Sequence, residues 1–402
     1  MSFSENSDEW NMTKSRRNMT THSQNEIATP KPAQSVRGLS RRRFLAGSML
    51  GLGGAVLASS PLALHAQQLE PFTLAPNSLT TGRGLGSDSS KPKVDFTDKM
   101  REYVIALSRW AKSYRSDFSI VAMNGLELTE YLETTLFAAR GTAEPARDYL
   151  RALDGILSEA PFFGYENYGE PTNGEESKYI LGYLDRLKLE GLKYLIVDYT
   201  NKIENMQAAR KQLSGLDAIY YAAPPPGMQL STLAKVPRTP IGSNPHVIDN
   251  LRQAKNFAMV LDSSPYGTKD AYINALAETN YDTLIIDPFH RGTIPLTYDD
   301  MKRLRYKKTG TPRTLMAYIN IATAETYRYY WKSNWRTGSP DFIGEGNLLA
   351  RWGQEHHVHY WTPKWQSLIY GSEASYLGGV MKLGFDGVLL GGLDEHSWWL
   401  DY

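Results

Sequence analysis

Carboxylates and aromatic rings recur at the points where short apolar runs of this chain end. Glu159, Asp287 and Asp394 are the acids that we single out for acid–base chemistry. Cleavage of a glycosidic bond needs two such groups, one to protonate the leaving oxygen and one to act as nucleophile or base. Aromatic faces pack on the C–H faces of sugar rings, while carboxylates accept hydrogen bonds from sugar hydroxyls. The combination favours a site that handles carbohydrate.

A wider set of polar and aromatic residues follows the same apolar runs, and we expect it to contact the substrate. Its members lie at or just beyond the ends of predicted strands: Asn124, Tyr165, Asp198, Tyr199, Asp262, Tyr318, Glu325, Arg328 and Trp361. For any single acid in the set, a helix cap or a solvated loop is an equally good interpretation. The pattern therefore indicates an acidic and aromatic mouth, without the distances that a mechanism needs.

Other chemistries find little support in the sequence. His357 and His359 would share a face of an extended segment, but no third ligand stands at a familiar spacing, so we predict no metal site and no cofactor. Serine-hydrolase, zinc-protease and phosphate-loop motifs are missing. The chain has no cysteine, which excludes disulfides and thiolate metal sites. Its 44 Lys and Arg balance 43 Asp and Glu, so we expect no nucleic acid partner.

Eight short apolar runs are the strand candidates that would position these residues. Most are apolar at consecutive positions, as is typical of parallel strands covered on both faces. The runs are 118–123, 161–165, 193–199, 218–222, 257–261, 283–287, 315–321 and 386–390, and helical patterns lie at 100–114, 177–190, 202–213, 268–279 and 366–383.

This alternation predicts an α/β fold, a single (β/α)8 TIM barrel over 96–402, with a doubly wound open sheet as the alternative. In a barrel the carboxyl ends of the strands meet at one face, which would collect the acids there. By this reading Glu159 immediately precedes the second strand.

One connection is unusually long for a barrel. Residues 223–255 contain several prolines and only a short helical pattern near Val247–Ala254. A domain boundary is the alternative interpretation. We favour a crossover within one barrel because each half of the chain holds only four strand candidates, too few to close a barrel.

The first residues resemble a bacterial export signal. We predict a disordered n-region over 1–39, a twin-arginine signal peptide over 40–66 and a lead-in segment over 67–95. A membrane anchor is the alternative, although glycines and serines make 47–64 weakly apolar. Later segments hold no apolar run of about 18 residues, so we expect no membrane span in the mature chain. The twin-arginine translocase would be a partner, and the mature protein would be periplasmic or secreted.

Three stretches resemble glycoside hydrolase family 114, the family of endo-α-1,4-polygalactosaminidases: Leu315–Trp335, His359–Gln366 and Gly384–Asp394. Three others are similar to later strands of that family: Met100–Leu128, Asp154–Phe163 and Tyr194–Thr200. In the usual family order the segment resembling Gly384–Asp394 comes before the one resembling Met100–Leu128, whereas here it ends the chain. The resemblance therefore implies a circularly permuted TIM barrel.

The resemblance also implies hydrolysis of an amino-sugar polysaccharide, α-1,4-galactosaminan, by a pair of carboxylates. Glu159 stands where the family has its glutamate, but the aspartate at the end of the family's fourth strand reads Gly391, and the Gly-Glu after its third strand reads Ala322-Thr323. Two hypotheses follow: an active hydrolase that uses Glu159 with Asp394 or Asp287, or a barrel that binds the polymer without cutting it.

Overall fold

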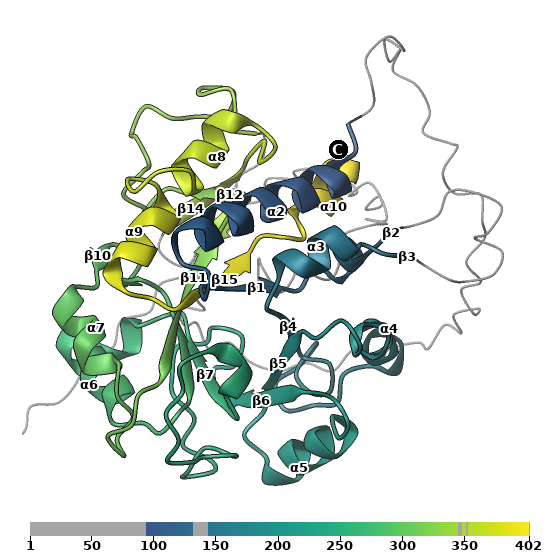
Figure 1. Cartoon of the computed structure of the whole chain (residues 1–402), viewed down its shortest axis with the longest axis vertical. Helices are drawn as coiled ribbons and strands as arrows, with labels where there is room; N and C mark the ends of the chain where they lie inside the picture. Colours follow the sequence, from purple (N-terminus) through teal and green to yellow (C-terminus); the bar gives the residue numbers. More distant parts are fainter. Residues whose placement is uncertain (1–93, 132–143, 345–347, 351–352, 402) are drawn as a thin grey trace, which may run out of the picture. The chain divides into compact units, whose positions relative to one another are not determined.

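The computed structural model describes residues 94–131, 144–344, 348–350 and 353–401. Eight parallel strands form one sheet in the order β6-β5-β4-β1-β15-β11-β8-β7 (Figure 1). Their bounds are β1 Ser119–Met123, β4 Gly155–Glu159, β5 Lys193–Tyr199, β6 Ala218–Ala223, β7 Phe257–Val260, β8 Thr283–Ile286, β11 Thr314–Asn320 and β15 Gly387–Gly391. The predicted leader (1–39 and 40–66) and nearly all of the lead-in lie outside the described residues.

The sheet is a nearly closed parallel barrel, which confirms the predicted α/β barrel. Each strand pairs with the one that precedes or follows it in the chain, and β1 joins the two ends by pairing with both β4 and β15. β6 and β7 stand at the two ends of the hydrogen-bonded order. Side chains complete the ring between them, because the ring of Tyr221 in β6 lies 5.7 Å from that of Phe257 in β7. A doubly wound sheet would reverse its strand order, so that alternative is wrong.

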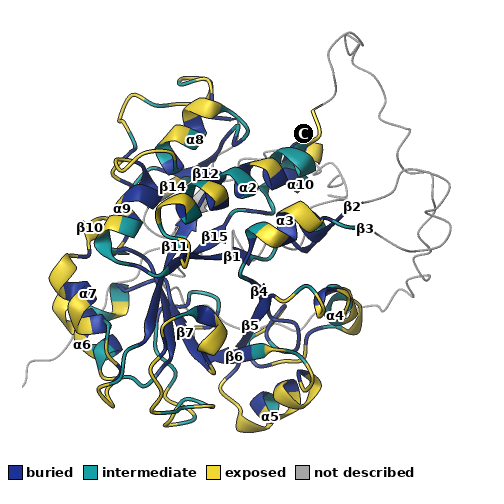
Figure 2. Cartoon of the chain, viewed as in Figure 1, coloured by how far each residue is buried: buried dark blue, intermediate teal, exposed yellow. Residues whose placement is uncertain are grey.

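Helices cover the outer face of these strands, as Figures 1 and 2 show. Every residue of β4, β5 and β15 is buried, which is why their sequences are apolar at consecutive positions rather than alternating. The helices are α2 Phe96–Tyr114, α3 Arg147–Ala152, α4 Gly174–Leu187, α5 Ile203–Gln212, α6 Lys269–Ala277, α7 Tyr298–Leu304, α8 Pro363–Ile369, α9 Tyr376–Leu383 and α10 Glu395–Asp401. None of these described helices is long and apolar enough to cross a membrane.

The second strand lies six residues before its predicted position. The run 161–165 is a buried loop, and the strand is β4, whose last residue is Glu159. The loop needs no strand partner for its first amides, because the N–H groups of Phe162 and Phe163 both donate to the carboxylate of Asp198 at 3.1 Å. Glu159 therefore ends a barrel strand instead of preceding one.

The single helix predicted over 366–383 is two helices. α8 ends at Ile369, and α9 begins after Ser375, whose side chain accepts the N–H of Gly378 as a cap. Gly371 lies between them with a φ of 106°, a conformation that favours glycine. The apolar pattern ran through this turn because both helices bury a face against the same barrel.

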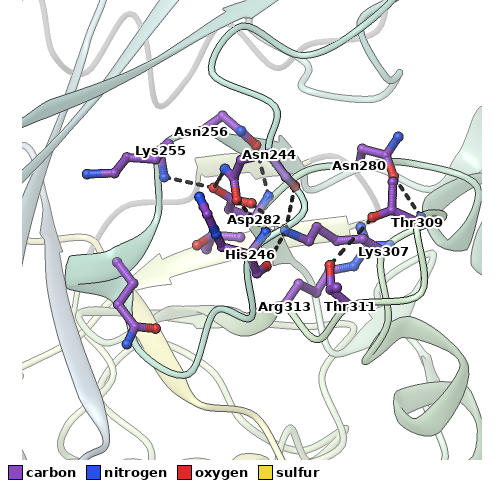
Figure 3. A network of polar contacts seen from close by, with 12 residues as sticks. Asn244, His246, Lys255, Asn256, Asn280, Asp282, Lys307, Thr309, Thr311 and Arg313 are labelled. Carbon is purple, nitrogen blue, oxygen red and sulfur yellow. Dashed lines mark hydrogen bonds and ion pairs between the residues drawn. The ribbon is translucent and has the colours of Figure 1, made fainter.

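The long crossover joins two strands of one sheet, so the domain-boundary interpretation of 223–255 is wrong. Its predicted helical stretch is a short 3₁₀ turn, Leu251–Gln253. Figure 3 shows the polar network that holds it beside Asp282, the residue before β8. Lys307 donates to the carbonyls of Asn244 and His246 at 3.0 and 2.7 Å and lies 3.0 Å from the carboxylate of Asp282.

Asp282 completes this fastening from the barrel side. Its second carboxylate oxygen accepts from the Asn244 side chain at 2.8 Å and from the N–H of Lys255 at 2.9 Å. The side chains of Lys307 and Asp282 are both fully buried. The ion pair is therefore the point at which crossover and barrel share one buried hydrogen-bond network.

Replacing Lys307 with methionine is expected to lower the free energy of unfolding by about 3–5 kcal/mol, because it leaves the Asp282 carboxylate buried without its cation. Urea unfolding measures the change. Lys364→Met is the matched control, since the Lys364–Asp341 pair is exposed on both sides and should contribute at most about 1 kcal/mol. Equal losses in the two variants would contradict the proposed fastening.

Candidate functional site

A two-residue turn after β1 gathers two of the predicted acids. Asn124 and Gly125 both have positive φ, 57° and 61°. The side-chain amide of Asn124 donates to Glu159 Oε2 at 2.8 Å, and the N–H of Gly125 donates to Asp394 Oδ1 at 3.0 Å. A Cβ at position 125 would lie 2.9 Å from the Cβ of Leu393, so glycine is needed there for space as well as for φ. The turn therefore connects the carboxyl group that ends β4 with the one that follows β15, the two neighbours of β1.

Glu159 is the more enclosed of the two predicted catalytic acids that this turn contacts. Its side chain is nearly buried, and its Oε1 accepts the hydroxyl of Tyr199 from β5. Burial raises the pKa of Glu159 above its ordinary value, and the charge of Asp394 adds to this, while the hydrogen bonds from Tyr199 and Asn124 oppose it. A carboxyl group with a raised pKa keeps its proton to higher pH than an ordinary glutamate, which suits acid–base chemistry.

Asp287, the third predicted acid, belongs to a buried ion cluster. Arg328 binds both of its carboxylate oxygens, at 2.9 and 2.8 Å, and also lies 2.5 Å from Glu325. Burial raises the pKa of Asp287, an effect that the Arg328 guanidinium opposes. The structure thus brings the predicted contact residues Glu325 and Arg328 together with Asp287. Arg328 forms ion pairs with both carboxylates.

A small antiparallel sheet stands beyond the end of β11 and carries an acid that the sequence analysis missed. β12 (Thr323–Glu325) pairs with β14 (Gly353–His357), which pairs with β13 (Leu348–Ala350), and the register sets Glu355 opposite Glu325. The Thr323 hydroxyl donates to Glu355 Oε2 at 3.0 Å. Burial, then the charge of Glu325, raises the pKa of Glu355 to about 8. Strand-end positions flagged the other acids, whereas Glu355 reaches the site through a long-range pairing that leaves no local signal.

Tyr318 on β11 links the two groups of carboxyls. Burial raises the pKa of its hydroxyl strongly, and the charges of Glu325, Glu355 and Glu159 contribute. The same hydroxyl fills the space beside Gly391, where an added Cβ would lie only 2.4 Å away. The place in which the resemblance puts an aspartate is therefore occupied by a phenol.

Two predicted contact residues serve the framework. Asp198 is fully buried, accepts the amides of Phe162 and Phe163, and receives the hydroxyl of Tyr220 at 3.0 Å. Burial raises its pKa to about 7. Asp262 accepts the N–H of Ser264 at 2.8 Å and so shapes the turn after β7.

The remaining predicted contacts are aromatic. Tyr165 is buried within the loop after β4. Trp361 packs against Phe96 and Trp399, with ring centroids 4.8 and 5.0 Å away, in a cluster formed by the start of α2 and by α10. Asn124 and Tyr199 thus contact Glu159, and Tyr318 lies within electrostatic reach of it. Trp361 belongs to a different cluster.

The histidine pair has partners of its own. His357 Nδ1 lies 2.5 Å from the carboxylate of Glu395, and the ring of Trp398 stacks on His357 at 3.8 Å. Among the residues that the structure describes, no group of three side chains is arranged to hold a metal ion.

An apolar cavity of about 390 Å³ lies between α7 and α9, outside the strands. Phe289 and Tyr376 line it, and both rings also contact Arg328 from behind, with its guanidinium carbon 5.3 and 5.8 Å from their centroids. Its walls are rings and aliphatic chains, so the carboxyl chemistry belongs to the mouth and not to this cavity.

Comparison with known proteins gives relatives without an assigned activity. No family model matches the chain. It is 31% identical over 160 residues to the uncharacterized protein MJ1477 of Methanocaldococcus jannaschii, which covers 38% of this chain and 44% of that protein. An uncharacterized protein of Thermotoga maritima is 37% identical over 84 residues (21% and 24%), and one of Deinococcus radiodurans 28% over 125 (31% and 37%). The chain spans less than half the length of these curated relatives, so function has to come from the site.

Asp198 predicts a pH dependence of stability. With a pKa of about 7 when folded and an ordinary value of 3.8, the folded protein holds a proton that the unfolded chain releases between these pH values. The free energy of unfolding of the wild type should therefore fall, relative to Asp198→Asn, by up to about 1.4 kcal/mol per unit as pH rises from 4 to 7. Urea unfolding at intervals across this range measures the difference, and a constant difference would contradict the assignment.

The crowding at Gly391 predicts that even alanine is costly there. Gly391→Ala should lower stability by about 1–3 kcal/mol, because the new methyl group meets the Tyr318 ring. Gly379→Ala in α9 is the control: its Cβ meets nothing within 4 Å, and it should gain about 0.5–1 kcal/mol. Thermal unfolding compares the two, and a Gly391→Ala protein as stable as the wild type would refute the crowding.

Proposed function

We propose that this protein is an exported glycoside hydrolase that acts on an amino-sugar polysaccharide of the α-1,4-galactosaminan type, with Glu159 as one of its two catalytic carboxyl groups. The observation that carries the proposal is the setting of Glu159: it ends a barrel strand, is nearly buried, and is oriented at both oxygens by Tyr199 and Asn124. Burial at the carboxyl end of a parallel barrel strand is the setting in which such groups do acid–base chemistry.

The charge of the mouth supports an amino sugar. Its carboxyl groups outnumber its cations, because Arg328 is already paired with Asp287 and Glu325. A polymer with protonated amines would be attracted to the ionised carboxylates of this mouth, whereas an acidic polysaccharide would be repelled. The Tyr318 ring, which is partly exposed beside these acids, supplies aromatic surface for sugar faces.

The second carboxyl group has two candidates from the sequence. Asp394 is partly exposed and lies close enough to raise the pKa of Glu159. Asp287 spends both oxygens on Arg328. Of these two, Asp394 is therefore the one whose carboxylate is accessible to a substrate.

The family assignment and the permutation are parts of the same proposal. In the ring of strands β1 lies next to β15, although β1 is the first of the eight barrel strands in the chain and β15 is the last. The helices beside them also meet, since the rings of Phe96 in α2 and Trp399 in α10 have centroids 6.2 Å apart. The crossover 223–255 spans β6 and β7, where the ring lacks a hydrogen-bonded pair. These features fit a family 114 barrel whose old ends are joined by the crossover. Export by the twin-arginine translocase to the periplasm or beyond rests on the leader sequence alone.

A carbohydrate-binding barrel that does not cleave is the second candidate. Gly391 favours it, since the position of the family aspartate carries no side chain and the Tyr318 hydroxyl occupies its space. Such a protein would keep the acidic, aromatic mouth and lose turnover.

Glu159→Gln is expected to reduce the release of reducing ends from galactosaminan by about 100-fold or more while the polymer still binds, because the amide keeps the shape of the side chain and cannot transfer a proton. Glu170→Gln, an exposed change in the loop after β4, is the control and should release product at the wild-type rate. Binding of the polymer by the wild type without release at any pH would replace the hydrolase with the binding barrel.

A further inference from the structure

Glu355 reaches the mouth from β14 and is fixed there by the strand pairing. It stands opposite Glu325 in the register, and its Oε2 accepts the Thr323 hydroxyl from β12 at 3.0 Å. That is its one hydrogen bond within the described residues, so Oε1 is left for another partner. The strand pairing holds the carboxyl in place, while the side chain keeps one oxygen for substrate.

The groups around Glu355 favour its protonated form. Glu325 faces it from β12, and Glu395, which pairs with His357, faces it from the start of α10. Arg328 acts in the opposite direction but is already shared between two carboxylates. Burial and these charges raise the pKa of Glu355, so its carboxyl group keeps the proton to higher pH than an ordinary glutamate.

Glu159 differs in its hydrogen bonds, although burial raises its pKa as well. Both of its oxygens accept hydrogen bonds, from Tyr199 and Asn124, and donors of this kind stabilise an ionised carboxylate. The charges of Glu159 and Glu355 both act on the hydroxyl of Tyr318. The Tyr318 hydroxyl therefore lies within electrostatic reach of Glu355, whose surroundings favour the protonated form, and of Glu159, whose two oxygens both accept hydrogen bonds.

We propose that Glu355 is the proton donor of the hydrolysis and that Glu159 is the base that activates water. As the glycosidic C1–O bond breaks, the Glu355 proton moves to the leaving oxygen. A water molecule forms the new C1–O bond and gives a proton to Glu159, and exchange with solvent restores both groups. This assignment rests on the proposed glycosidase function.

Neither sequence-predicted partner fits the donor role as well. Asp394 accepts the backbone N–H of Gly125, whereas Glu355 faces a second carboxylate, Glu325, in the strand register. Asp287 is bound at both oxygens by Arg328. Glu355 is the acid whose bonds leave it able to give up a proton.

The test compares leaving groups in the full chain. Glu355→Gln should lower the release of reducing ends from galactosaminan by about 100-fold or more, and lower cleavage of an aryl galactosaminide by less than about tenfold, because a phenolate leaves without protonation. Asp394→Asn should show no such difference between the two substrates. Glu373→Gln, an exposed change before α9, is the control and should leave both rates unchanged.

A second variant protects the test against misfolding at position 355. The Thr323 hydroxyl lowers the pKa of Glu355, so Thr323→Val should move the alkaline limb of kcat/KM on galactosaminan to higher pH. A wild-type rate in Glu355→Gln, an unmoved limb in Thr323→Val, or leaving-group dependence in Asp394→Asn would each overturn the assignment while Glu159→Gln still loses activity. A wild type that cleaves neither substrate would instead overturn the hydrolase function itself, and the assignment with it.

Discussion

The buried ion pair between Lys307 and Asp282 is the constraint on which the rest of the barrel depends. Seven strand pairings hold the sheet, and the eighth junction, between β6 and β7, has ring contacts and a long crossover instead of a ladder. Lys307 and Asp282 fix that crossover beneath the amino ends of the strands. Because the amino ends of β7 and β8 are then held in register, the side chains at the carboxyl ends of the strands have fixed positions in the mouth.

The sequence predicts the barrel and the first half of the site because both follow from local patterns. Consecutive apolar residues mark strands buried on both faces. The positions of Asn124 and Tyr199 at or just beyond strand ends predicted that they reach the mouth, where the structure shows both hydrogen-bonded to Glu159. The second strand was misplaced because the loop 161–165 is as apolar as a strand, and the amides that distinguish it are satisfied by Asp198, 35 residues away. Glu159 borders both segments, but it precedes the predicted strand and ends the real one, so the correction moves it from the amino end to the carboxyl end of a barrel strand.

The other half of the site depends on contacts that no local pattern contains. Glu355 faces Glu325 through a strand pairing between residues thirty positions apart in the chain. It also bonds to Thr323, the position at which the resemblance places a glutamate. Asp287 was predicted as a catalytic candidate from its strand-end position, and the partner that occupies it, Arg328, lies 41 residues further along the chain. Position along a strand indicates which residues reach the mouth, but not which of them are already bound to one another.

Burial, more than residue identity, then decides what the carboxyl groups can do. An aspartate at 391 would have to displace Tyr318, so aligned positions alone are a poor guide to activity in this barrel. A mouth with many carboxyls and a shared arginine cannot keep all of them ionised without water, and the pKa values of Glu159 and Glu355 rise accordingly. Crowded acids thus become separable into those that hold a proton and those that are surrounded by donors. A division of this kind is what acid–base cleavage of a glycosidic bond requires.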